Sequence, residues 1–153
     1  MVTAQECIFC KIVRNEIPSK RVYEDENNIA FLDINPASPG HVLVVPKKHF
    51  GSMHDIDAST MEKLGTAVKK VNDIVKEKLN CEGTNVMLNN GRIAGQIVEH
   101  IHFHIIPRYQ GDGIELHFPR FKTDEKYFDE MQKKLAAPAE KRKAADDDWT
   151  RFA

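Results

Sequence analysis

Three histidines alternate with apolar residues along one short segment, at His100, His102 and His104. In a β-strand, side chains two residues apart project from the same face, so the three imidazoles would lie side by side. Buried imidazoles lose their hydration, so three of them need several hydrogen-bond partners or a chemical task. Two kinds of chemistry fit. Three imidazoles can hold a catalytic zinc ion with an open position, or one imidazole attacks a substrate while its neighbours position and protonate the reacting groups.

A glycine-containing loop, Asn89-Asn-Gly-Arg-Ile-Ala-Gly-Gln96, precedes these histidines. Backbone amides in such a loop can form a concave site for an anion. Beside a nucleophilic histidine, they would hold the non-bridging oxygens of a phosphate group during attack at phosphorus. The combination favours phosphoryl chemistry, and the three-histidine metal site stays open as the alternative.

Hydrophobic periodicity and turn residues indicate the elements that position these groups. Turns rich in Asn, Pro and Gly separate the β-type runs, which favours antiparallel neighbours. A spacing of three or four residues predicts a long amphipathic helix, whose start is marked by Ser59 and Glu62 as a capping box. The sequence therefore predicts an α+β fold, with an antiparallel sheet of about five strands and two main helices. The expected strands cover residues 22–24, 29–33, 41–46, 85–89 and 100–106, and the expected helices cover residues 59–79 and 123–137.

The 153 residues are 41% hydrophobic and 29% charged, the balance of one globular domain. We expect this domain to span residues 1–137, ending before Pro138. Residues 138–153 are rich in charge and offer little to bury besides Trp149 and Phe152, so we expect a charged C-terminal tail.

Charge and hydropathy exclude two classes of partner. Lys and Arg number 22 against 23 Asp and Glu, so no basic field exists to hold nucleic acid. No apolar run approaches the roughly 20 residues of a membrane span, and the N-terminus carries no basic region followed by an apolar run. Three cysteines make a poor disulfide framework and suit a reducing compartment. We therefore expect a soluble, cytoplasmic protein.

The run His100-Ile-His-Phe-His-Ile-Ile106 resembles the signature of the histidine-triad (HIT) family. Further matching segments fall in the family's order, from residue 1 to about residue 125. They are Cys7-Ile-Phe-Cys-Lys-Ile12, Ile17-Pro18, Phe31-Leu-Asp-Ile34, Pro39-Gly-His-Val-Leu-Val-Val-Pro46, Asn89, Gly95-Gln96 and Ile106-Pro-Arg108. The chain is most similar to the small prokaryotic-type nucleotide-binding members that carry a Cys-x-x-Cys pair. The resemblance implies the HIT fold and a homodimer in which the sheets of two copies join.

The resemblance also implies a mechanism. His102 would attack the α-phosphorus of a nucleoside 5′-phosphate ester, anhydride or amide, and water would release the monophosphate from a nucleotidyl-histidine. His104 would contact the phosphate and assist the leaving group, with His41 close by. Because the third triad position is His104 and not Gln, the chain resembles the hydrolase branches of the family.

The family pattern implies a purine nucleotide pocket, in which Asp33 accepts hydrogen bonds from both ribose hydroxyls. The residues expected to sandwich the purine are Ile8, Phe9, Ile12, Phe31, Ile34 and Leu43, and those expected beside the phosphate are Asn89, Gly95, Gln96, Ile97 and Val98. One residue departs from the pattern. Most hydrolase members carry Ser or Thr where this chain has Ile97, so a hydroxyl that relays a proton to the leaving group is absent.

Cys7 and Cys10 alone are half of a metal site, or a redox pair, or two small buried side chains. In Cys-containing members of the family, the other two ligands match His49 and His100. The resemblance thus implies a structural zinc ion held by Cys7, Cys10, His49 and His100. Because His100 cannot serve two metal sites, no catalytic metal is expected.

The expected activity is hydrolysis of nucleoside 5′-phosphoramidates or related adducts, releasing AMP or GMP. A dinucleoside polyphosphate hydrolase is the first alternative, and it needs positive charge beyond the α-phosphate, for which Arg92 and Arg108 are candidates. A nucleotide-binding adaptor with little turnover is the second alternative.

Overall fold

The structure is a computed structural model that describes residues 2–116 and 118–136. The described residues up to Ile114 form one compact unit, and those from Glu115 onward form a second. The expected tail, residues 138–153 with Trp149, lies outside the described residues. The boundary expected at residue 137 therefore stays a prediction.

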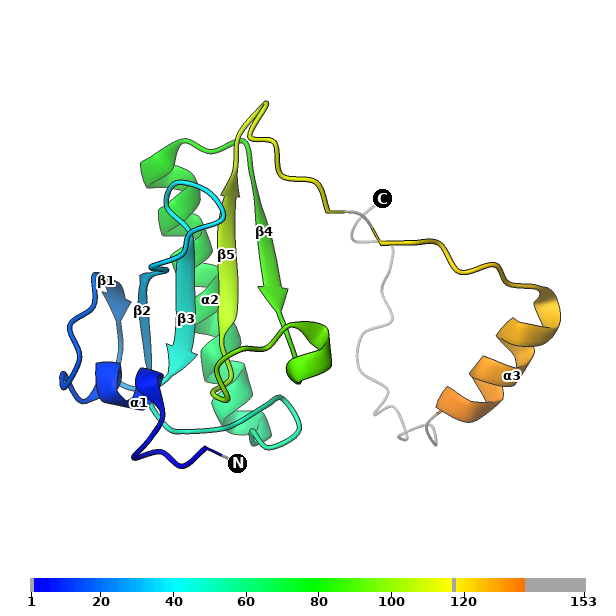
Figure 1. The fold of residues 1–153 in the computed structure, drawn as a ribbon, viewed down its shortest axis with the longest axis horizontal. Helices are drawn as coiled ribbons and strands as arrows, with labels where there is room; N and C mark the ends of the chain where they lie inside the picture. Colours follow the sequence, from blue (N-terminus) through cyan, green and yellow to red (C-terminus); the bar gives the residue numbers. More distant parts are fainter. Residues whose placement is uncertain (1, 117, 137–153) are drawn as a thin grey trace, which may run out of the picture. The chain divides into compact units, whose positions relative to one another are not determined.

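The first unit is built on a five-stranded antiparallel sheet, which confirms the expected fold class (Figure 1). The strand order is β1-β2-β3-β5-β4, so β4 forms one edge. The strands are β1 (Arg21–Glu24), β2 (Asn28–Leu32), β3 (Val42–Pro46), β4 (Gly83–Leu88) and β5 (Phe103–Arg108). The expected strand over residues 100–106 is wrong at its start, because β5 begins only at Phe103. Before it, the backbone N–H of Ile101 donates to the carbonyl of Phe50 rather than to a neighbouring strand.

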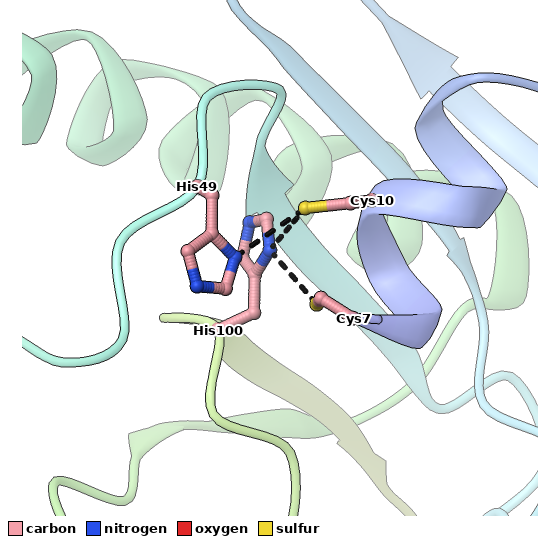
Figure 2. A group of neighbouring side chains, drawn as sticks. All are labelled: Cys7, Cys10, His49 and His100. Atoms are coloured by element: carbon pink, nitrogen blue, oxygen red, sulfur yellow. Dashed lines mark hydrogen bonds between the residues drawn. The ribbon is translucent and has the colours of Figure 1, made fainter. Parts of the chain in front are cut away.

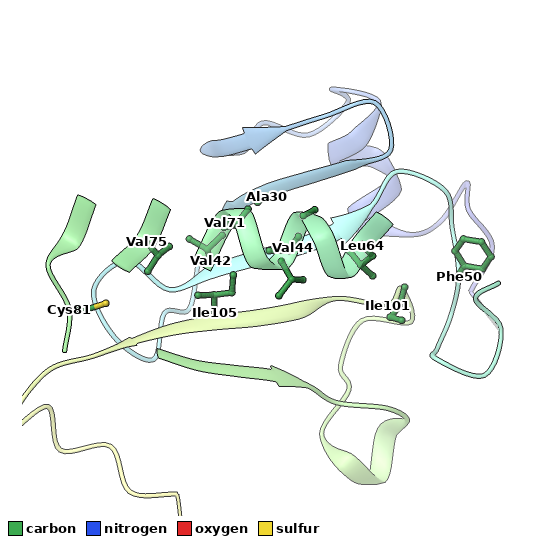
Figure 3. Close-up of a cluster of buried hydrophobic side chains, with 12 residues drawn as sticks. Ala30, Val42, Val44, Phe50, Leu64, Val71, Val75, Cys81, Ile101 and Ile105 are labelled. Atoms are coloured by element: carbon green, nitrogen blue, oxygen red, sulfur yellow. The ribbon is translucent and has the colours of Figure 1, made fainter. Parts of the chain in front are cut away.

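The long helix α2 (Ala58–Leu79) covers one face of this sheet and contacts β2, β3, β4 and β5. The expected start at Ser59 is wrong. Asp57 caps the helix, because its carboxylate accepts hydrogen bonds from both the backbone N–H and the hydroxyl of Thr60. The apolar stripe of α2 packs on alternate strand residues (Figure 3). The buried residues of this core are Ala30, Val42, Val44, Phe50, Leu64, Ala67, Val68, Val71, Val75, Cys81, Ile101 and Ile105.

A second core lies on the opposite face, since it uses the intervening residues of β2 and β3. Its buried members are Cys7, Phe9, Cys10, Ile12, Ile29, Phe31, Leu43 and Val45. Half of them come from the short helix α1 (Ile8–Val13) and Cys7 just before it. The sequence patterns did not predict this helix, because six residues are too few to show a helical period.

The helix α3 (Glu125–Leu135) belongs to the second unit and is capped by Asp124, whose carboxylate accepts from the backbone N–H of Tyr127. It lies inside the expected helix at residues 123–137. None of the helices in the described residues is long and apolar enough to cross a membrane.

Candidate active site

The tautomer of His102 is set by the backbone of its neighbour. His102 Nδ1–H donates to the carbonyl oxygen of His100 at 2.7 Å, and Nε2 therefore carries a lone pair. The ring is 6% exposed and lies edge-on to Phe9, with centroids 5.2 Å apart. Burial lowers the pKa of His102, opposed by the His100 carbonyl and the charge of Asp33. His102 is therefore neutral at pH 7 and has the free nitrogen that a nucleophile needs.

His104 and His41 form a pair beside His102. The rings of His102 and His104 have centroids 4.9 Å apart, and His104 Nδ1 lies 3.0 Å from His41 Nε2. Asp33 Oδ2 is 3.7 Å from His41 Nε2. Burial, together with His102 and His41, lowers the pKa of His104 to about 4. The structure thus brings the three expected catalytic histidines and Asp33 into one cluster.

The residues expected around the purine separate into two groups. Phe9, Ile12, Phe31 and Leu43 are buried members of the second core. Ile8 and Ile34 are 45% and 88% exposed, so of the six they alone present apolar surface to solvent. Their contact with a base stays a prediction, as does the contact of Asp33 with ribose.

The loop expected to hold the phosphate is shaped by Gln96, which is buried. Its Oε1 accepts from the backbone N–H of Gly91 at 2.8 Å, and its Nε2 donates to the carbonyls of Gly51 and Val98 at 2.6 and 3.0 Å. Gly91 and Gly95 both have positive φ, 90° and 92°, which glycine adopts at little cost. The side chain of Gln96 is therefore occupied in holding the loop, a role that the sequence patterns did not indicate.

The sequence did not indicate a role for one further residue of this region, Asn90. The amide of Asn90 accepts from the backbone N–H of Met53 at 2.9 Å and lies 3.0 Å from the ring of His54. Asn90 thus ties the loop to residues 53 and 54, a long-range pairing for which the sequence holds no local signal. Ile97, the departure from the family pattern, is 93% exposed.

Four metal-ligating side chains, Cys7, Cys10, His49 and His100, meet in one group, as Figure 2 shows. His100 Nδ1 lies 3.5 Å from the sulfur atoms of both Cys7 and Cys10, and His49 Nδ1 lies 3.3 Å from the sulfur of Cys10. Zinc bound tetrahedrally by two thiolates and two imidazoles separates its ligand atoms by roughly 3.3–3.8 Å. The donor set and its spacing therefore fit a structural zinc ion.

His100 is oriented for this role by the other side of its ring. Its Nε2–H donates to the carbonyl of Pro46 at 2.8 Å, which leaves the lone pair on Nδ1, toward the sulfurs. Such a second contact fixes the ring of a metal-ligating histidine. Because both ring nitrogens of His100 are engaged away from His104, the three triad histidines do not converge on one point. The donor set does not fit the three-histidine zinc site.

Arg92 and Arg108, the candidates for positive charge beyond the α-phosphate, differ in whether their charge is paired. Arg108 donates to both carboxylate oxygens of Asp112 and to the side chain of Asn85, so its charge is paired. Arg92 has no hydrogen bond or ion pair within residues 2–116 and 118–136. It lines a hollow of about 820 Å³ beside the phosphate loop, together with Val2, His49, Phe50, Gly51, Ser52, Asp55, Gly91, Gly95, Gln96, Ile97 and Glu99.

Comparison with known proteins agrees with this geometry. The model of the HIT domain family matches residues 14–111. An uncharacterized HIT-like protein of Methanocaldococcus jannaschii is 50% identical over 129 residues, 84% of this chain and 98% of the relative. An adenosine 5′-monophosphoramidase of Candida albicans is 40% identical over 138 residues, 87% of this chain and 89% of the relative.

A solved structure of a zinc-bound histidine triad family protein from Mycobacterium smegmatis superposes with a TM-score of 0.70 at 36% identity. The match covers 75% of this chain and 84% of that one. Sequence and structure agree over the part of the chain that carries the histidine cluster. This chain belongs to the HIT domain family.

Proposed function

We propose that this protein hydrolyses nucleoside 5′-phosphoramidates or related nucleoside monophosphate adducts at the α-phosphorus, through a nucleotidyl-histidine on His102. The hydrogen bond from His102 Nδ1–H to the carbonyl of His100 carries the proposal, because it leaves Nε2 unprotonated in a buried ring. The Candida albicans relative, named as an adenosine 5′-monophosphoramidase, supports a hydrolase that acts on AMP adducts.

In the first step, the Nε2 lone pair of His102 forms a bond to the α-phosphorus, and the bond from phosphorus to the leaving group breaks. His104 contacts the phosphate, and the amides of the loop held by Gln96 stabilise the charge on its oxygens. An amine leaving group takes up a proton from solution as it departs. In the second step, water attacks the same phosphorus and gives up a proton to solution, the bond to His102 breaks, and the nucleoside monophosphate leaves. His102 returns to its neutral form.

The nucleotide that we propose is a purine nucleotide such as AMP or GMP. Asp33 would accept hydrogen bonds from the ribose hydroxyls, since a carboxylate offers two acceptor oxygens. Ile8 and Ile34 would contact the base, over the buried Phe9 and Phe31. Asn89, Gly95 and the backbone of Val98 would lie beside the phosphate.

We propose that Cys7, Cys10, His49 and His100 hold a structural zinc ion, which joins the N-terminal segment to the segments that precede α2 and β5. The zinc-bound relative supports this ion. It supplies a fixed tetrahedral junction and no reacting group.

We also propose a homodimer formed through β4. This strand is an edge of the sheet, and Val86 on it is 45% exposed. A second copy would pair the free backbone groups of the edge and extend the sheet. Sedimentation of the wild type and of Val86→Lys tests it: we expect a dimer that dissociates in the variant, whereas a monomeric wild type would contradict it.

A second candidate activity is hydrolysis of dinucleoside polyphosphates. One observation favours it: Arg92, which has no hydrogen bond or ion pair among the described residues, lines the hollow beside the expected phosphate loop, together with the carboxylates of Asp55 and Glu99. The third candidate is a nucleotide-binding adaptor, which would bind AMP but turn over none of its adducts.

The test is release of AMP from adenosine 5′-phosphoramidate, adenylyl sulfate and diadenosine triphosphate, without added metal. We compare the wild type, His102→Ala, and the control Lys70→Gln, which changes an exposed residue of α2. Release by the wild type and the control that vanishes in His102→Ala supports the proposal. If AMP binds but no adduct turns over, the adaptor replaces it, and preference for diadenosine triphosphate supports the second candidate.

A further inference from the structure

The backbone N–H of Ala37 decides where His41 carries its proton. It lies in the loop between β2 and β3 and donates to His41 Nδ1 at 3.0 Å. His41 is 4% exposed, and burial lowers its pKa, so the ring is neutral at pH 7. A neutral imidazole carries one N–H, and a nitrogen that accepts a hydrogen bond cannot be the one that carries it. The proton of His41 is therefore on Nε2.

The proton on His41 Nε2 also determines the tautomer of His104. His41 Nε2 lies 3.0 Å from His104 Nδ1, whereas Asp33 Oδ2 is farther away at 3.7 Å. Because His41 Nε2 is a donor, His104 Nδ1 must accept, and the proton of His104 is on Nε2. His102 and His104 thus have opposite tautomers, each set by one backbone group.

This arrangement also prevents His104 from taking up a second proton and acting as a general acid. A second proton on His104 would sit on Nδ1 and point at the N–H of His41, and two donors cannot share one hydrogen bond. The groups that face His104 are His41, His102 and the carboxylate of Asp33. His104 can donate a hydrogen bond through Nε2–H to a phosphate oxygen, but to give that proton away it would have to become an anion.

We infer that no side chain among residues 2–116 and 118–136 protonates the leaving group, and that the preferred substrates of the site are mixed anhydrides of a nucleoside monophosphate rather than phosphoramidates. The inference rests on the proposed function and narrows its substrate class. A carboxylate, sulfate or phosphate leaves as a stable anion when its bond to phosphorus breaks, whereas an amine must gain a proton. When the substrate is a phosphoramidate, the amine leaving group therefore takes this proton from solution. Ile97, exposed beside the phosphate loop, carries no exchangeable proton in its side chain.

The same tautomers exclude a second interpretation of this cluster. One oxygen of Asp33 and one ring nitrogen each of His41 and His104 lie within 4.8 Å of one another, a donor set that could hold a metal ion. A metal would need the lone pair of His41 Nε2, which is the nitrogen that carries the proton. The Ala37 amide thus makes His41 a positioning residue for His104 rather than a ligand.

The pH dependence of two substrates with the same nucleotide tests the inference. With adenosine 5′-phosphoramidate, we expect kcat/KM to rise about tenfold for each unit by which pH falls, between about pH 8 and 6, because the proton comes from solution. With adenylyl sulfate, kcat/KM should change less than about twofold over that range, because no proton is needed. Parallel profiles for the two substrates would overturn the inference while leaving the proposed function intact. Loss of both activities would count against both.

A second test adds a hydroxyl at the exposed position. Ile97→Ser should raise the ratio of kcat/KM for the phosphoramidate to kcat/KM for adenylyl sulfate by about tenfold at pH 8. Ile97→Ala controls for the loss of side-chain volume and should not raise this ratio. Nitrogen-15 NMR of the histidine rings reads the tautomers directly, and a proton on His104 Nδ1 at pH 7 would contradict the argument at its first step.

Discussion

His102 Nδ1 lies 2.7 Å from the backbone carbonyl oxygen of His100. His100 therefore does two things: its backbone accepts the hydrogen bond of the proposed nucleophile, and its ring faces the sulfurs of Cys7 and Cys10. The proposed zinc ligands and the proposed reacting histidine thus share one residue. If both proposals hold, loss of the metal should lower catalytic activity.

Removing one zinc ligand tests this connection. In Cys10→Ser, we expect zinc content to fall from one ion per chain to near zero, and kcat to fall about tenfold with a smaller change in KM, because His102 loses its fixed orientation. Metal analysis and steady-state kinetics measure both effects. Cys81→Ser is the matched control, since it changes a buried thiol in the other core. A fully active Cys10→Ser without zinc would show that the metal does not orient His102.

We expect the side chain of Gln96 to stabilise the loop rather than to contact the substrate. Gln96→Ala removes three hydrogen bonds that join Gly91, Gly51 and Val98, and we expect it to lower the free energy of unfolding by about 2 kcal/mol. KM should rise because the phosphate amides are no longer held in place. Denaturant unfolding and kinetics check this, with the exposed Gln110→Ala as control. Unchanged stability in Gln96→Ala would contradict the role.

Acid should destabilise the zinc-loaded protein through His104. Its pKa is lowered to about 4 in the folded state, whereas an unfolded histidine titrates near ~6.5. Between these values the unfolded chain binds more protons, so the free energy of unfolding falls as pH drops from about 6.5 to about 4, by about 2 kcal/mol from this residue. Unfolding at several pH values in wild type and His104→Gln measures it. Equal pH slopes in the two proteins would refute the assignment.

We expect the packing of α2 on the sheet to affect the stability of the protein and to leave substrate binding nearly unchanged. Leu64 is fully buried in the first core, and Leu64→Ala should cost about 3 kcal/mol through the lost apolar contacts and the cavity left behind. KM for AMP adducts should stay within about twofold of the wild type, because the histidine cluster lies on the other face. Thermal unfolding and kinetics check both. A large rise in KM would mean that the two faces of the sheet are coupled.

The sequence predicted the elements with a long, regular pattern and missed those fixed by single contacts. The period of α2 and the alternation in β3 follow from repeated burial on one face, so both were predicted. The start of β5 at Phe103 was not, because the hydrogen bond from Ile101 to the carbonyl of Phe50 joins residues far apart in the chain. The sequence did not predict the helix α1, because Phe9, Cys10 and Ile12 are too few to form an apolar stripe with a helical period.

The candidate site shows the same division. Residue types and spacing predicted that His102 lies beside His104 and that Cys7, Cys10, His49 and His100 form a group, and the structure has both groupings, whereas their chemical roles stay predictions. The tautomers of His41 and His100 could not be predicted, because they depend on contacts with the backbone N–H of Ala37 and the backbone carbonyl of Pro46. Backbone groups do not depend on residue type, so the sequence holds no signal for these contacts. Gln96 was expected beside the phosphate, and only its three partners show that it is occupied in holding the loop.

The nucleotidyl-histidine is the central claim, and trapping it is the most direct test. The zinc-loaded wild type is mixed with adenylyl sulfate, quenched in base within the first turnover, digested and analysed by mass spectrometry. We expect one adenylyl group on the peptide that contains His102, absent in His102→Ala and slow to hydrolyse in the quench. Turnover with no adduct on that peptide, and with inversion of configuration at phosphorus, would show that water attacks the substrate directly and would contradict the account.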